Sequence, residues 1–293
     1  MRKLLLVGMM VPAMALAVGV FAPARAAAED WQKTYPIAGK ASLNISTGDA
    51  SLELRGCADC HAIKVVLDWR DRKPSDFVLE ESQSGDHVSF ELKEKTHIGI
   101  HISMGNFHEP HVTVETPAAL DLDAKTSDGS VKVAGVDGYL QLHTSDGSVD
   151  IEDVGGALRL SASDGGIRIH NVRGTLESRS SDGRATIDGR FTNLQVHTSD
   201  GNMDLTIDEG SQLTGSSRIE SSDGKVALHL PKTLAADLDV HTSDGKINCD
   251  LPLRMDNYNS NGGSGHHLNG HLNAGGAPLS IHTSDGSVTI TGQ

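Results

Sequence analysis

The residues best suited to chemistry run from Cys57 to His61, in the order Cys-Ala-Asp-Cys-His. This is literally C-x-x-C-H, the attachment motif of c-type haem. The same cysteines fit a disulfide in a turn between two strands, because residues 51–54 and 63–69 both have strand-like patterns. No helical pattern flanks the motif to surround a haem. We therefore predict a disulfide between Cys57 and Cys60, with haem attachment, zinc and free thiols as the alternatives.

Histidine is the second candidate, because neutral imidazoles bind Zn, Cu or Ni. In a strand, His97 and His101 would lie about 13 Å apart, too far to share one ion. Four more histidines stand three positions before a repeated Asp and alternate with apolar residues: His143, His197, His241 and His282. Others cluster at His108, His111, His266, His267 and His271. We interpret these side chains as exposed polar residues, and predict no metal, cofactor-binding or catalytic residue.

Aspartate is the third candidate, because it recurs in Ser-Asp-Gly turns. The eight copies are Asp128, Asp146, Asp164, Asp182, Asp200, Asp223, Asp244 and Asp285. Stacked carboxylates could bind Ca²⁺, as Gly/Asp-rich β-rolls do, or act as an acid–base pair about 5 Å apart. Every neighbouring pair in a stack has that separation, so it singles out no catalytic pair. We expect each Asp to bond its own turn backbone, with Ca²⁺ as the alternative.

The elements that position these residues follow from the repeat. The first five Asp residues are spaced 18 apart, and the later spacings are 23, 21 and 41. Leu stands six positions before the Asp in seven of the eight repeats, and most repeats carry apolar residues three and five positions after it. This period of two predicts a strand with one buried face on each side of a turn. Glycine suits such a turn because it tolerates positive φ.

A degenerate ninth copy lies far upstream. Residues 43–54 fit the same register, with Leu43 six positions before Asp49 and Leu54 five positions after it. An antiparallel meander of all these strands would expose one wide apolar face, and no amphipathic helix remains to cover it. A solenoid closes that face onto itself. We therefore predict an all-β fold, a parallel β-helix (β-solenoid) with an 18-residue Ser-Asp-Gly repeat and the repeat leucines stacked inside.

The repeat pattern L-x-[LVI]-x-T-S-D-G-x-V-x-[VIL], preceded by a Leu-Asn-Ile-Ser-Thr-Gly-Asp start, resembles the bacterial "putative adhesin" β-strand-repeat family. That family is similar to the head domains of autotransporter adhesins. The resemblance covers roughly residues 40–293. It implies a right-handed β-helix at or near the cell envelope. It transfers no catalytic residue to this chain.

The N-terminus indicates export. Arg2 and Lys3 precede an uncharged apolar run and the A-x-A pattern of residues 24–26, so residues 1–28 are predicted to be a signal peptide. A β segment beginning the solenoid is expected over residues 29–120, and the repeat β-helix over 121–293 with a Gly/Asn-rich insertion at 255–278. No later apolar run predicts a membrane segment, and the natural locations are periplasm, cell surface or medium.

Composition and repeat regularity together favour a binding or scaffolding role. The net charge of −14 repels phosphate backbones, which argues against a nucleic-acid partner. We predict a non-catalytic, adhesin-like or cell-envelope protein; the alternatives are a polysaccharide-acting β-helix enzyme and a c-type haem protein.

The C-terminus suggests one further partner. The chain ends at Gln293, three residues after Ile290 of the last repeat. A polar insertion would protect the edge of that repeat poorly. We therefore expect self-association or partner binding through an exposed final coil, weakened by proline at Val288 or Thr289.

Overall fold

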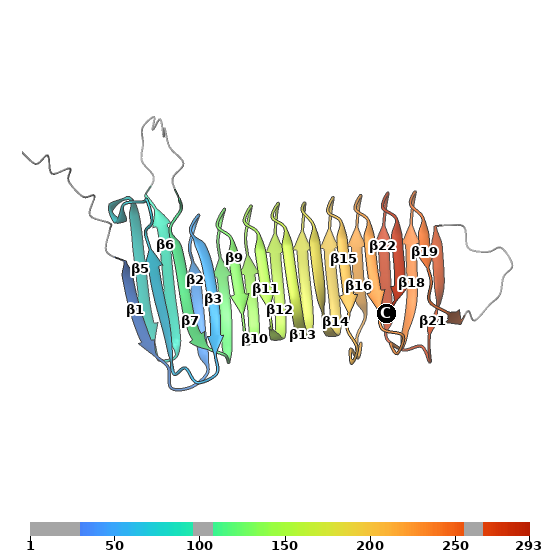
Figure 1. Ribbon diagram of the computed structural model, residues 1–293, viewed down its shortest axis with the longest axis horizontal. Helices are drawn as coiled ribbons and strands as arrows, with labels where there is room; N and C mark the ends of the chain where they lie inside the picture. The colour runs from blue at the N-terminus through green and yellow to red at the C-terminus, as the bar shows by residue number, and fades with distance from the viewer. Residues whose placement is uncertain (1–29, 96–107, 255–265) are drawn as a thin grey trace, which may run out of the picture.

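The computed structural model describes residues 30–95, 108–254 and 266–293. Over these ranges the protein is all-β, with 23 strands in one continuous sheet and a single 3₁₀ turn, η1 (Pro74–Asp76). The sheet wraps almost closed around one core, as an elongated, solenoid-like stack (Figure 1). No helix in the described ranges is long and apolar enough to cross a membrane. The predicted signal peptide, His97, His101 and residues 255–265 of the insertion lie outside these ranges.

The strands form two series of hydrogen-bonded neighbours. The first series runs in space as β1 (Trp31–Pro36), β4 (Ala62–Asp68), β7 (His111–Pro117), β3 (Ser51–Cys57), β9 (Val131–Ala134), β11 (Val149–Glu152), β13 (Ile167–Ser180), β14 (Ala185–Thr198), β15 (Met203–Ile207), β17 (Val226–Leu230), β23 (Val288–Gly292) and β19 (Ile247–Cys249). The second runs as β5 (Phe77–Ser84), β6 (His87–Glu94), β2 (Ala41–Ser46), β8 (Leu120–Lys125), β10 (Asp137–His143), β12 (Gly155–Ala162), β13, β14, β16 (Ser217–Ser221), β22 (Pro278–Thr283), β18 (Ala236–Thr242), β21 (His267–Leu272) and β20 (Leu253–Arg254). Strands β13 and β14 are long enough to belong to both.

Alternating sequence produces this arrangement. Each repeat places one strand in each series, and repeats that are neighbours in the stack pair in parallel. The predicted leucine stack is confirmed, because Leu140, Leu158, Leu176 and Leu194 are direct partners on adjacent strands and are at most 1% exposed. The buried side chains of both series form one core. Burial of this continuous apolar ladder is the main force holding the stack together.

The upstream copy stacks where its register predicts. Strands β2 and β3, on either side of Asp49, pair in parallel with β8 and β9 of the first regular repeat; Leu43 lies opposite Leu122 and Leu52 opposite Val131. On its other side this copy is covered by β6 and β7. In Figure 1, β2 and β3 accordingly lie between the teal β6 and β7 and the green β9.

The expectation that the final coil is exposed is wrong. Strand β22 lies between β16 and β18, and β23 lies between β17 and β19, so the last repeat in sequence is inside the stack (Figure 1). Both edges of the strand that carries Val288 and Thr289 are paired. Gln293 is also bound, since its backbone N–H donates to Leu230 O at 3.0 Å. The last repeat therefore offers no free edge for self-association.

The insertion covers an edge that it was expected to leave open. Strand β21 pairs antiparallel with β18, and β20 with β21, beyond the last parallel strand of the second series. Leu272 is 4% exposed, and Leu268 packs against the core. These two leucines, together with the antiparallel pairing of β21, hold the otherwise polar insertion against the core.

Candidate functional site: the Ser-Asp-Gly edge

The turns stack along one edge of the solenoid, here called the turn edge: Asp49, Asp128, Asp146, Asp164, Asp182, Asp200, Asp223, Asp285 and Asp244, in spatial order. The backbone locks each turn to its neighbour. Ser145 N–H and Asp146 N–H both donate to Ser127 O, at 3.1 and 3.0 Å. The next repeat uses Ser145 O in the same way, and the pattern continues along the edge. The turns thus form a continuous ladder of backbone hydrogen bonds along the turn edge, here called the rail.

A buried hydroxyl group supports this rail from inside. The residue two positions before the Asp carries a hydroxyl in every regular repeat except that of Ala162. Thr144 Oγ1 donates to Ser127 O at 3.2 Å, and Thr198 Oγ1 to Ser181 O at 3.2 Å. In three repeats this hydroxyl oxygen also accepts the N–H of the turn glycine. Thr or Ser at this position in seven of the eight repeats is the sequence signal for this role.

The turn glycines are needed for a different reason from the one expected. Of the regular turns, only that of Gly183 has positive φ, at 99°. In seven of the eight regular turns, a Cβ on the glycine would come within 2.6 Å of the carbonyl oxygen of the glycine in the neighbouring turn. A Cβ on Gly165 would lie 2.6 Å from the carbonyl carbon of Gly147 and closer still to its oxygen. Close stacking, not left-handed backbone, therefore excludes a side chain at most of these positions.

The aspartate carboxylates point into solvent. All nine residues are exposed, and within the described ranges no hydrogen bond joins one of these carboxylates to its turn. The expectation that each Asp bonds its own turn is wrong, because the serine carbonyls and the buried hydroxyl groups already close the turns. The pKa of Asp49 is raised, first by burial and then by the charge of Asp128. The edge therefore presents carboxylates at about the strand spacing of 4.8 Å.

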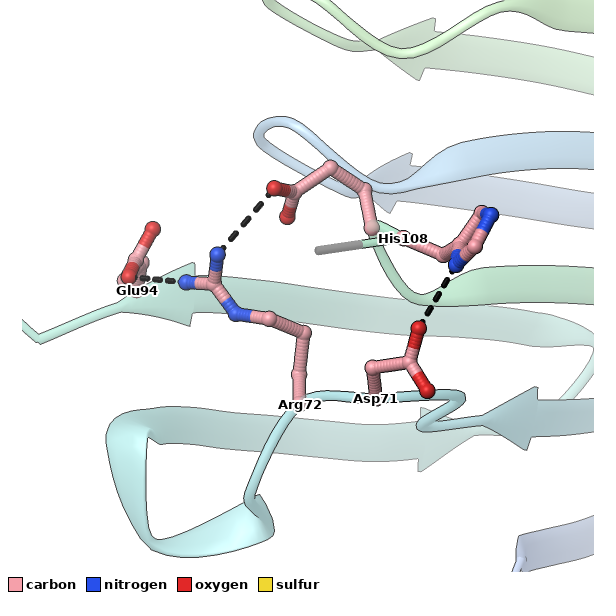
Figure 2. A network of polar contacts seen from close by, with 5 residues as sticks. Asp71, Arg72, Glu94 and His108 are labelled. Atoms are coloured by element: carbon pink, nitrogen blue, oxygen red, sulfur yellow. Dashed lines mark hydrogen bonds and ion pairs between the residues drawn. The ribbon is translucent and has the colours of Figure 1, made fainter. Parts of the chain in front are cut away.

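A polar network lies at the N-terminal end of this row (Figure 2). Arg72 donates to Glu94 and, at 3.1 Å, to Glu109. Burial raises the pKa of Glu109; Arg72 opposes the shift, and the charges of Glu94, Asp49 and Asp128 add to it. The side chains come from segments far apart in the sequence, so no local sequence motif predicts the network.

A second contact ties the same loops together. His108 Nδ1 lies 2.6 Å from Asp71 Oδ2, beside the Arg72 contacts (Figure 2). Both residues are exposed. The contact joins the loop after β4 to the segment before β7.

The cysteines of C-x-x-C-H lie at disulfide distance. Cys57 ends β3 and Cys60 follows in the turn, with their Cα atoms 5.4 Å apart. Glu115 approaches Cys60 Sγ at 3.7 Å, and within the described ranges these three residues form the one trio whose ligand atoms lie within 4.8 Å. A disulfide leaves neither sulfur as a thiolate, so haem attachment and zinc binding both require reduction first. Cys249 is half-buried against the core, and burial raises the pKa of its thiol.

Together these features define a solenoid-like repeat protein with an acidic, backbone-locked edge. The chain belongs to the Toastrack DUF4097 family, whose model matches residues 37–291. No curated protein matches it.

The solved structures that match most of the chain are distant from it. One is described as a putative cell adhesion protein from Clostridium sporogenes (12% identity, 90% of this chain and 100% of that chain covered, TM-score 0.28). Another is a putative adhesin from Bacteroides fragilis (9%, 90% and 98%, TM-score 0.33). A third is described as a putative lipid binding protein from Parabacteroides distasonis (10%, 90% and 97%, TM-score 0.27).

Proposed function

We propose that the protein is an exported, non-catalytic solenoid that binds or scaffolds at the bacterial cell envelope in an adhesin-like way. The observation that carries the proposal is the turn edge, a row of exposed carboxylates on an interlocked backbone. We also propose that the coil is a right-handed parallel β-helix, because connections between parallel strands are right-handed in about 98% of cases.

The geometry suits repeated weak contacts. Each carboxylate alone is exposed and would contribute little in salt solution. The rail fixes nine of them at one spacing, so a partner with repeated charges meets several at once and gains by multivalency. A net charge of −14 adds long-range attraction for cations. The partner class is therefore a polymer or surface with repeated cationic groups, such as amino sugars or basic protein segments.

The test removes charge from the edge while preserving the rail. The triple variant Asp146→Asn, Asp164→Asn and Asp182→Asn keeps every backbone hydrogen bond of the turns. We expect it to bind intact cells or envelope fractions of the producing bacterium at least about tenfold more weakly than wild type at 0.15 M salt, with unchanged thermal melting.

A matched control loses the same charge elsewhere. Glu80, Glu152 and Glu209 are exposed on other parts of the described surface, and their replacement by Gln should leave binding unchanged. Equal binding by the Asp variant and wild type would overturn the proposal. Hydrolysis or elimination of a polyuronide, abolished by Asp49→Asn, would support the enzyme alternative; the acidic edge argues against it because polyuronides are themselves anionic.

A further inference from the structure

The order of the repeats in space brings together histidines that are far apart in the sequence. Strand β22 lies beside β18 on one side, and β21 lies beside it on the other. His282 is therefore the direct parallel partner of His241, and His267 is its direct antiparallel partner. The row could not be predicted from spacing along one strand or from the order of the repeats, because it depends on the order of the strands in space.

The three imidazoles form a continuous row on the outer face of the sheet. All three residues are exposed. The His241 and His282 rings stack with centroids 5.1 Å apart and planes at 14°, whereas the His241 and His267 rings meet edge to face with centroids 6.0 Å apart. The three side chains leave the sheet from neighbouring strands whose spacing is fixed by hydrogen bonds.

A carboxylate already orients one end of the row. His267 Nε2 lies 2.9 Å from Asp239 Oδ1, and Asp239 stands two positions before His241 on the same face of β18. Carboxylates in this position fix the tautomer and ring orientation of a metal-bound histidine and increase its basicity. The contact leaves Nδ1 of His267 available for a ligand.

We propose that His241, His267 and His282 bind one divalent transition-metal ion, of the class Zn²⁺, Cu²⁺ or Ni²⁺, with Asp239 orienting His267. Imidazole is a preferred ligand of these ions, with metal–nitrogen bonds of about 2.0–2.1 Å for zinc. In the structure the ring nitrogens do not yet converge on one point. The proposal requires rotation about the exposed side-chain bonds to bring the ring nitrogens together, while the hydrogen-bonded strands keep their spacing. The negative charge of the protein favours the cation.

The chain contains a matched control for this site. His143 occupies the same register position and the same outer face, but its direct neighbours are Lys125 and Ser161. A single imidazole beside an ammonium group has no partner ligand in the row. The site is therefore a consequence of the strand order near the C-terminus and not of the repeat itself.

The experiment titrates tag-free, chelator-treated, disulfide-intact full chain with ZnCl₂ or NiSO₄ alone, measured by isothermal titration calorimetry. We expect about one ion per chain for wild type, at least about tenfold weaker binding for His241→Gln, and wild-type binding for His143→Gln. Electron paramagnetic resonance of the Cu²⁺ form should show nitrogen ligands that decrease in His241→Gln.

Circular dichroism checks the fold, and His282→Gln provides a second variant if the first is perturbed. The proposal is overturned if wild type binds no stoichiometric ion or if His241→Gln and His282→Gln both bind as wild type does. It is also overturned if Cys249→Ser abolishes binding, which would place the ion at the thiol.

Discussion

The replacement Gly165→Ala tests the close stacking of the turns. Its Cβ would lie 2.6 Å from the carbonyl carbon of Gly147 and 3.1 Å from Ser148 N, and these atoms belong to backbone that cannot rotate away. The two turns would have to separate by more than an ångström. That movement would break the N–H bonds of Ser163 and Asp164 to Ser145 O, now 3.1 and 3.0 Å. Overpacking costs about 1–3 kcal/mol and the two lost hydrogen bonds about 1 kcal/mol each, so we expect the free energy of unfolding to fall by about 3–5 kcal/mol.

The neighbouring residue provides the control. A Cβ on Gly166 would meet nothing nearer than Arg184 O at 3.9 Å, and its φ is not positive. Gly166→Ala should therefore change the free energy of unfolding by less than about 1 kcal/mol, in the stabilising direction, because alanine restricts the unfolded chain. Urea unfolding followed by far-UV circular dichroism measures both variants. If Gly165→Ala unfolds at the same urea concentration as Gly166→Ala, close stacking is not what selects glycine in these turns.

Three further changes test the core, the rail and the acidic network. Leu158→Ala, in the buried leucine stack, should cost about 2–5 kcal/mol in urea unfolding, and a neutral result would contradict the register. Ala162→Thr should stabilise the protein by about 1 kcal/mol by giving Ser145 O the hydroxyl donor that other repeats have; a lower melting temperature would argue against the rail. The raised pKa of Glu109 means that the wild type loses stability as pH rises from about 4.5 through that pKa. Glu109→Gln should remove this loss and be more stable than wild type at pH 7. If the free energy of unfolding of the variant depends on pH as that of wild type does, the effect is excluded.

The local alternation of apolar and polar residues was sufficient to predict the strands and their register. The alternation around each Asp predicts which residues are buried, and Leu140, Leu158, Leu176 and Leu194 stack accordingly. The upstream copy at Asp49 fits the same rule, although a long segment separates it from the first regular repeat. These features could be predicted because a period of two and a fixed turn position leave only one face to bury.

Strand order could not be predicted by the same reasoning. Every repeat presents the same register to its neighbours, so nothing local distinguishes a repeat that stacks on the preceding one from a repeat inserted elsewhere. The spacing of 41 between Asp244 and Asp285 was the one signal, since it gives enough chain to cross a neighbouring coil. The histidine row depends on this order, so it could not be predicted from the spacing of histidines along the chain either.

The inserted order also determines which strands end the stack and which of them are covered. A strand at either end of the stack, parallel or antiparallel, exposes unpaired N–H and C=O groups on its outer side. A chain that stopped at its last repeat could not cover itself, whereas an earlier repeat can be followed by a segment that turns back. Here β18 and β19 become the end coil, and β20 and β21 cover β18 with antiparallel pairs. At the other end, β4 and β5 pair antiparallel with β7 and β6. The edge left by β19 is only three residues long, and the insertion that covers β18 also supplies His267 of the histidine row.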